Sequence, residues 1–347
     1  MLAMQSGSNI QHSLLGEIAI PAFQDVEQAA LRIKNYVYQT PLLRSPILDE
    51  IAKARVWLKA ENLQVTGSFK ARGAFNALLN MSPEQRARGI IAYSTGNHGQ
   101  AIAWAARRLN TKATIVMPSD APQNKIRGAL MQGAEVRQYD RRSESREAIG
   151  MKILEETGGT LIPPGDHPDV LAGQGTVVLE ALAQLKRATT DNSPGVFITP
   201  CGGGGLAAGS SLVLDRLSPS TRIFAVEPAG FDDTVRSLSS GRRESNPPDS
   251  RSICDALQAY TPAELPYAIN RQLLNGAVAV SDEEVAAAIR FALEQLHILV
   301  EPGGCVALAA ILAGKLDLKG ENTMLVLSGG NIDMPLLAGI LNQVANQ

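Results

Sequence analysis

The chain has 347 residues, of which 45% are hydrophobic and 19% charged, so its composition supports globular folding with a sizeable core in one large domain or two. Its 32 basic and 34 acidic residues leave a net charge of −2, which excludes a broad electrostatic attraction to nucleic acid or to an anionic membrane surface. Three widely spaced cysteines exclude a disulfide framework and a CxxC metal site. The sequence has no apolar run of membrane-spanning length and no Lys or Arg before Arg32. We therefore expect neither a membrane protein nor a signal peptide, and we expect a cytoplasmic location.

Short apolar strands alternate with longer amphipathic helices along most of the chain. The first predicted elements are a helix over 25–37, a strand over 55–61 and a helix over 68–79. Further strands are predicted over 89–94, 112–118, 135–140, 195–200, 221–228 and 322–331. Further helices are predicted over 98–109, 122–132, 143–157, 170–185, 202–217, 283–297 and 304–316. This order indicates an α/β fold with two three-layer units, each a parallel sheet covered by helices on both faces.

The strand over 195–200 runs into four consecutive glycines, Gly202 to Gly205, and then into a helix. Glycine lets the backbone approach an anion closely, and a helix N-terminus presents unpaired N–H groups, so a phosphate ligand is the first interpretation. A tight turn without a ligand is the second. The third is a nicotinamide dinucleotide, because Gly202-x-Gly204-x-x-Ala207 fits the dinucleotide pattern and Glu227 ends the next strand, where a ribose-binding acid is expected.

Two further segments place polar groups at the start of a predicted helix. Lys70 lies in a mostly apolar stretch, where desolvation would lower the pKa of its amine and permit Schiff-base chemistry, although a solvated surface lysine is the commoner case. The segment STGNHGQ (94–100) closes a strand and opens a helix. Its hydroxyls and N–H groups suit a carboxylate ligand, but an ordinary capped turn has the same pattern.

The combination of motifs is far more specific than any one of them. In chain order they are TPL (40–42), GSFKARGA (67–74), STGNHGQ (94–100), AGQGT (172–176), GGGGL (202–206), VEP (226–228), EPGG (301–304) and LSGGN (327–331). With these motifs the chain resembles the fold-type II pyridoxal phosphate (PLP) enzymes, in particular the serine/threonine dehydratase and serine racemase family, from about residue 20 to the C-terminus. The resemblance implies a tryptophan synthase β-like homodimer. Each chain would have a large cofactor-binding domain over 1–81 and 166–347 and a small substrate-clamping domain over 82–165.

The resemblance also implies the site residues. Lys70 would hold the cofactor covalently and act as the catalytic base. The groups around the cofactor would be Phe69, Asn97, Gly202, Gly203, Gly204, Gly205, Leu206 and Ser328. The groups around the substrate would be Ser94, Thr95, Gly96, Asn97, His98 and Arg146. Thr95 stands where the racemases use a serine as a second acid–base group, and the extra methyl group restricts its χ1 angle, which disfavours racemisation.

The implied activity is β-elimination from L-threonine, L-serine or a related 3-hydroxy amino acid, giving a 2-oxo acid and ammonia. The alternatives are a serine-type racemase, a lyase for 3-hydroxyaspartate or a bulkier amino acid, and, remotely, an NAD-dependent dehydrogenase. Gly165 stands where relatives carry a larger residue, which predicts a widened substrate pocket.

A last motif, VEPAGFDD (226–233), resembles the divalent-cation site of the same family. Glu227, the Phe231 carbonyl and Asp233 would then bind Mg²⁺ or Ca²⁺ through oxygen atoms. A solvated acidic loop is an equally good interpretation of this segment.

Overall fold

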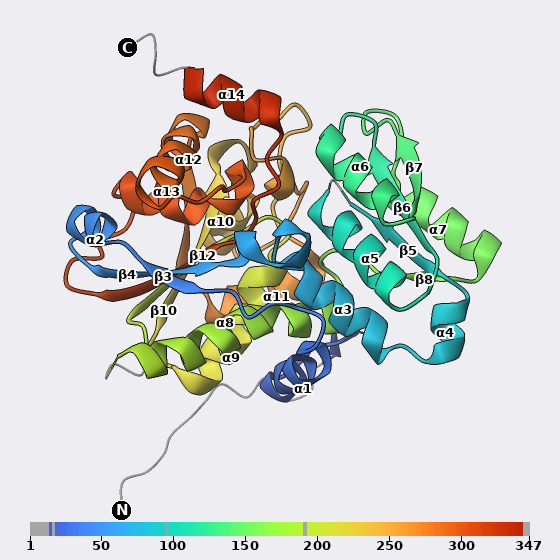
Figure 1. The fold of residues 1–347 in the computed structure, drawn as a ribbon, viewed down its shortest axis with the longest axis horizontal. Helices are drawn as coiled ribbons and strands as arrows, with labels where there is room; N and C mark the ends of the chain where they lie inside the picture. Colours follow the sequence, from blue (N-terminus) through green and yellow to red (C-terminus); the bar gives the residue numbers. More distant parts are fainter. Residues whose placement is uncertain (1–13, 16–17, 95, 190–192, 343–347) are drawn as a thin grey trace, which may run out of the picture.

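The computed structural model describes residues 14–15, 18–94, 96–189 and 193–342. Two sheets form its framework (Figure 1). In spatial order, the larger sheet contains β11 (Gly276–Val280), β10 (Arg222–Pro228), β9 (Val196–Pro200), β12 (Asn322–Leu327), β4 (Arg55–Ala60) and β3 (Leu42–Arg44). The smaller sheet contains β7 (Glu135–Tyr139), β6 (Ala113–Pro118), β5 (Ile90–Tyr93) and β8 (Thr160–Leu161). A two-stranded ribbon, β1 (Leu14–Leu15) with β2 (Ile18–Ala19), precedes them.

Helices cover both faces of each sheet. Those before residue 160 are α1 (Phe23–Ile33), α2 (Pro46–Ala52), α3 (Lys70–Asn80), α4 (Pro83–Ala87), α5 (Asn97–Arg108), α6 (Gln123–Met131) and α7 (Arg146–Thr157). Those after it are α8 (Pro168–Ala188), α9 (Gly205–Leu217), α10 (Asp233–Ser240), α11 (Glu264–Leu273), α12 (Asp282–Gln295), α13 (Val306–Leu312) and α14 (Met334–Asn342). None of the helices in the described part of the chain is long and apolar enough to span a membrane.

The larger sheet is buried on both sides because its strands are apolar at successive positions. On β4, Val56 and Leu58 join a core with α12 and α13, whereas Trp57 points the other way into a core with α8 and α9. Figure 1 shows these helix pairs on opposite faces of the sheet. Such near-continuous apolar strands are typical of parallel sheets covered on both faces.

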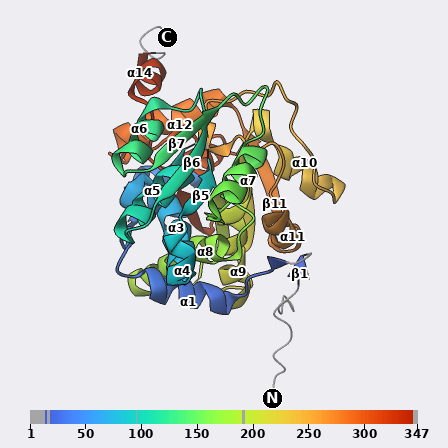
Figure 2. The same cartoon turned by 90° about the vertical axis from the view of Figure 1, so that its right-hand side faces the viewer.

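The smaller sheet has the same three-layer form. Helices α5 and α6 lie on one side of it and α7 on the other (Figure 2). Its four strands all fall within residues 90–161, while the strands of the larger sheet come from both sides of this stretch. The two expected parallel α/β units are therefore confirmed, and the domain boundaries at 82 and 165 stay a prediction.

Helix α8 runs between α3 and α9, and small residues let the three approach closely. A Cβ atom built on Gly173 would lie 2.5 Å from the Cα of Gly73 on α3. A Cβ atom on Gly209 of α9 would lie 2.7 Å from the backbone nitrogen of Gly175. The glycines of the AGQGT segment thus bring the N-terminal end of α3, with Lys70, near the glycine turn that opens α9.

The structure differs from the predicted elements mainly where segments are short. The unpredicted elements are helices α2, α4, α10, α11 and α14 and strands β1, β2, β3, β8 and β11. Strand β3 pairs with β4 antiparallel rather than parallel. The helix predicted from residue 68 begins at Lys70, because Ser68 is extended (φ −162°, ψ 159°) and bridges to Gly329.

Candidate active site

A sharp turn places Lys70 beside the end of β12. Thr66 and Gly67 both have left-handed backbone conformations, with φ of 68° and 72°, which is rare for a β-branched threonine. The Asn331 side-chain amide donates to the Thr66 carbonyl at 2.8 Å, and the Phe69 N–H donates to the Ser328 carbonyl at 3.1 Å. The strained turn is therefore held by the LSGGN segment, and it directs Lys70 into the interior.

The side chain of Lys70 is half-buried, and its amine is turned toward the interior. Its Nζ donates to the carbonyl of Pro164 at 3.2 Å and lies 5.1 Å from the centroid of the Phe69 ring. Burial lowers the pKa of the amine from 10.5 to about 8, because the charged form loses its water. A substantial part of the amine is thus neutral near pH 8, as a nucleophile or a general base requires.

The glycine turn faces the same carbonyl. A Cβ atom on Gly205 would lie 3.8 Å from the Pro164 oxygen, so the turn and the Lys70 amine approach one point from two sides. Gly204 has a φ of +90°, and its carbonyl accepts a 3.2 Å hydrogen bond from the Asn270 side chain. Helix α9 begins at Gly205, so the N–H groups of its first turn, including that of Leu206, have no partner within the helix and suit an anion.

The segment predicted to bind the substrate, residues 94–98, contributes the next group of contacts to the site. Thr95 lies outside the described residues. The Ser94 hydroxyl accepts hydrogen bonds from the N–H groups of Gly96 at 2.9 Å and Gly99 at 3.0 Å. The Asn97 side chain donates to Glu301 and accepts from Asn331 at 2.9 Å. The loop is therefore attached to the same segments that hold Lys70.

Lys125 of α6 was not singled out from the sequence. Its stem packs so closely on Gly96 that any side chain at that position would clash with it. Its Nζ pairs with Asp255 at 2.6 Å and with Glu301 at 2.9 Å, and these carboxylates raise the pKa of the lysine despite its burial. Lys125 thus connects the smaller sheet's α6 to the larger sheet's loops directly beneath the substrate loop.

Three other residues predicted to lie at the site are Ser328, Arg146 and Gly165. Ser328 is buried, and its N–H donates to the Gly304 carbonyl at 3.0 Å. Arg146 begins α7, with its guanidinium 5.2 Å from the ring centroid of Tyr93, the residue before the substrate loop. Gly165 does not open a wider pocket, because a Cβ atom there would lie 2.9 Å from the Cβ atom of Ala263.

Comparison with known proteins decides which ligand this arrangement takes. The family model for pyridoxal-phosphate dependent enzymes matches residues 33–329. The chain belongs to this family. The site fits PLP, because a half-buried amine of lowered pKa and a glycine turn that opens a helix meet at one carbonyl.

Individual members of the PLP family match nearly the whole chain. L-threo-3-hydroxyaspartate ammonia-lyase of Saccharomyces cerevisiae is 41% identical over 93% of this chain and 97% of its own length. L-threonine ammonia-lyase of Thermotoga maritima is 37% identical over 92% of this chain and 78% of its own length. The solved structure of serine racemase from Dictyostelium discoideum has a TM-score of 0.84 at 36% identity, covering 91% of this chain and 100% of that one.

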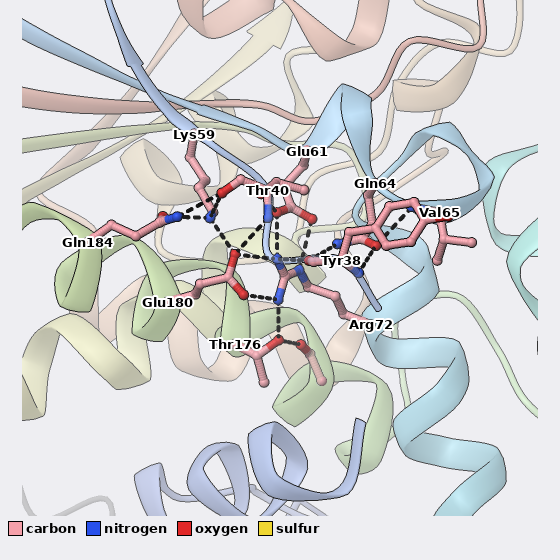
Figure 3. Close-up of polar contacts among 11 residues, drawn as sticks. Tyr38, Thr40, Lys59, Glu61, Gln64, Val65, Arg72, Thr176, Glu180 and Gln184 are labelled. Atoms are coloured by element: carbon pink, nitrogen blue, oxygen red, sulfur yellow. Dashed lines mark hydrogen bonds and ion pairs between the residues drawn. The ribbon is translucent and has the colours of Figure 1, made fainter. Parts of the chain in front are cut away.

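A buried ionic network holds α3 just after Lys70 (Figure 3). Arg72 donates to both oxygens of Glu61, at 2.8 and 2.7 Å, and its guanidinium also pairs with Glu180 of α8 at 3.0 Å. Lys59 of β4 binds Glu180 and, at 2.7 Å, the Thr40 carbonyl. The pairing lowers the pKa of Glu61 although the carboxyl is fully buried. The network ties α3 to β4 and α8 two residues after Lys70.

The predicted cation ligands come together in part. Glu227 is fully buried, and its two oxygens accept the N–H groups of Thr234 at 3.1 Å and Val235 at 2.9 Å. Asp233 accepts from Asn246 with one oxygen, while its second oxygen, Oδ2, is buried with no partner among the described residues. Burial raises the pKa of both carboxyls, that of Asp233 to about 6.

The burial of Glu227 also decides against the dehydrogenase alternative. A fully buried carboxylate cannot bind a ribose, and the chain belongs to the PLP family instead.

Proposed function

We propose that this chain is a PLP-dependent ammonia-lyase for 3-hydroxy amino acids, with L-threo-3-hydroxyaspartate as the preferred substrate. The observation that carries the lyase proposal is the Lys70 amine, with its lowered pKa, beside the same Pro164 carbonyl as the glycine turn. The choice of substrate draws support from the yeast relative of that name. L-threonine and L-serine remain the alternative substrates.

When bound, PLP supplies an electron sink that makes the Cα proton of an attached amino acid acidic. Gly202 to Leu206 would hold its phosphate, Lys70 its aldehyde carbon, and Asn97, Phe69 and Ser328 its ring. The neutral amine of Lys70 would take the Cα proton, and the substrate loop would fix the α-carboxylate. Loss of the β-hydroxyl group followed by hydrolysis releases one 2-oxo acid and one ammonia per amino acid.

Arg146 would bind the second carboxylate of 3-hydroxyaspartate. Its partly exposed guanidinium lies over Tyr93 at the edge of the substrate loop and pairs with Glu147 at 2.7 Å, which a carboxylate ligand could replace. A hydrogen bond to a charged group contributes about 1.5–3 kcal/mol, so Arg146→Ala should lower kcat/KM for L-threo-3-hydroxyaspartate by about 10- to 150-fold. The value for L-threonine, which lacks this carboxylate, should change by less than about 3-fold.

The matched control for this test is Arg142→Ala, which removes an exposed arginine four residues earlier. It should leave both substrates unaffected. An equal loss for both substrates in Arg146→Ala would contradict the assigned role.

Serine racemase activity is the second candidate. The fold similarity to the Dictyostelium enzyme favours it, whereas Thr95, with its restricted hydroxyl, favours elimination. The two outcomes differ in product and are separated by chiral analysis of the residual amino acid.

We also propose that Glu227, the Phe231 carbonyl and Asp233 bind Mg²⁺ or Ca²⁺. The unpartnered Oδ2 of Asp233 beside a second buried carboxylate fits a hard cation. At a hundredfold excess over Kd, either ion should raise Tm by about 3–8 °C. The shift should fade as the pH falls below about 6, because protons then compete for Asp233.

Differential scanning calorimetry with and without each ion tests the cation site. Asp233→Asn should abolish the response, whereas Asp232→Asn, which removes the partly exposed partner of Arg236, should keep it. A full response in Asp233→Asn would place the ion elsewhere.

A homodimer is proposed as the assembly. Ile47 and Ile51 of α2 are nearly half exposed, next to a groove that Ile47 shares with Phe291 and Arg290 of α12. Burying such an apolar surface favours association. Light scattering should give twice the chain mass for the wild-type holoenzyme and a lower mass for Ile47→Glu; an unchanged mass in the variant would exclude this surface.

A further inference from the structure

His98 carries a polar atom that the site described so far leaves unexplained. Its ring is 2% exposed, and Nε2 lies 3.0 Å from the carbonyl oxygen of Ile162. A carbonyl only accepts hydrogen bonds, so Nε2 carries the ring proton and Nδ1 is left with a bare lone pair. This Nδ1 is buried and has no partner among the described residues.

The same short segment holds the reactive lysine. Ile162 accepts from His98, and Pro164, two residues later, accepts from Lys70 at 3.2 Å. Two carbonyls of one short segment, residues 162–164, therefore position the imidazole and the amine. One N–H of a protonated Lys70 is used by Pro164, which leaves two others in need of acceptors.

Electrostatics keep this imidazole neutral. Burial, followed by the charge of Lys70 and then by that of His167, lowers the pKa of His98 to about 3, and the Ile162 contact opposes this only in part. At the pH at which Lys70 titrates, His98 therefore cannot serve as an acid. It can only offer the lone pair of Nδ1.

We propose that Nδ1 of His98 accepts a hydrogen bond from the Lys70 amine and holds the protonated amine in place after it has taken the substrate proton. His98 is then a positioning residue for the base. A buried acceptor without a donor is unfavourable, so supplying a donor to Nδ1 favours the charged amine. The inference rests on the proposed role of Lys70 as base and is independent of which amino acid is the substrate.

Two substitutions distinguish the roles of the two ring nitrogens of His98. His98→Gln can place an amide where Nε2 lies and keep the Ile162 contact, but it removes the acceptor at the Nδ1 position. His98→Asn does the reverse, because its side-chain oxygen lies near the position of Nδ1. The pair thus distinguishes support of the Lys70 amine from support of the 162–164 segment.

The readout is the titration of Lys70 in the cofactor-free protein, followed by mass spectrometry of its reductive methylation as a function of pH. Burial alone lowers the pKa of Lys70 to about 8, so the wild-type midpoint should lie above this value if the Nδ1 contact is made. In His98→Gln the midpoint should fall by about one unit, since one unit corresponds to about 1.4 kcal/mol, the size of one hydrogen bond. In the holoenzyme kcat should fall about 10- to 100-fold with little change in KM. His98→Asn should restore the midpoint to within about 0.3 units of wild type.

Equal midpoints in wild type and His98→Gln would overturn the proposal and leave His98 a purely structural role. If His98→Gln fails to fold, ¹⁵N NMR of the wild-type imidazole decides instead. The proposal requires a protonated Nε2 and a bare Nδ1, and a proton on Nδ1 would refute it. Loss of 2-oxo acid production with a normal Lys70 titration would count against the proposed function alone.

Discussion

Lys70→Ala should yield a folded protein that no longer holds PLP covalently and that eliminates at a rate at least about 10³-fold below wild type. Under the proposed function Lys70 both bonds the cofactor and takes the Cα proton, and each role is large: general base catalysis alone contributes about 10²- to 10⁴-fold. Folding should be preserved, because a methyl group replaces an amine whose burial disfavours its charged form. Absorbance after gel filtration and 2-oxo acid release measure the two effects.

Lys152→Ala is the matched control for Lys70→Ala. Lys152 lies on α7 with three quarters of its side chain exposed, and it reaches Glu156 only at 4.0 Å. This variant should keep cofactor and activity. Retention of covalent PLP in Lys70→Ala would move the attachment to another amine and contradict the assignment of the site.

Arg72→Leu should lower the free energy of unfolding by about 3–5 kcal/mol, because it leaves Glu61 fully buried without its cation. The pKa of Glu61 is lowered in the folded state, so the carboxylate stabilises the wild type above pH 4.5. That contribution is lost as the pH falls through the lower folded-state pKa. Urea titrations at pH 7 measure the loss, and titrations at decreasing pH measure its acid dependence.

Arg137→Leu provides the control for the buried pair. Arg137 and Glu135 form an exposed ion pair at 2.6 Å, which contributes at most about 1 kcal/mol. Removing both charges in Glu61→Leu with Arg72→Leu should recover part of the stability, since no unpaired charge then remains. A single Arg72→Leu variant as stable as Arg137→Leu would show that the network does not hold α3.

The sequence predicts the parts of the site that are built from local motifs. Lys70 at a helix start and the glycines at the start of α9 are recognisable because a turn, an apolar stretch and a helix follow one another within a few residues. The helix ends are displaced by up to four residues. Helix α7, for example, begins at Arg146 rather than 143, because the Ser145 side chain caps it.

The parts of the site that the sequence did not predict depend on contacts between segments far apart in the chain. Lys125 and Glu301 are 176 positions apart, and the Pro164 carbonyl that receives Lys70 is 94 positions away. Glu180 lies on a long helix, and from the sequence alone a charged residue there is predicted to face solvent. Its pairing with Arg72 appears only when α3 packs against α8. No local pattern encodes such pairs, because the fold alone brings them together.

A single incubation distinguishes elimination from racemisation. Holoenzyme is given enantiopure L-threo-3-hydroxyaspartate, and the 2-oxo acid, the ammonia and the stereochemistry at Cα of the remaining amino acid are measured in the same sample. The proposed function predicts 2-oxo acid and ammonia in equal amounts, with the residual substrate still of L configuration at Cα. Accumulation of the Cα-inverted amino acid in the absence of 2-oxo acid would contradict it and assign the chain to the racemases.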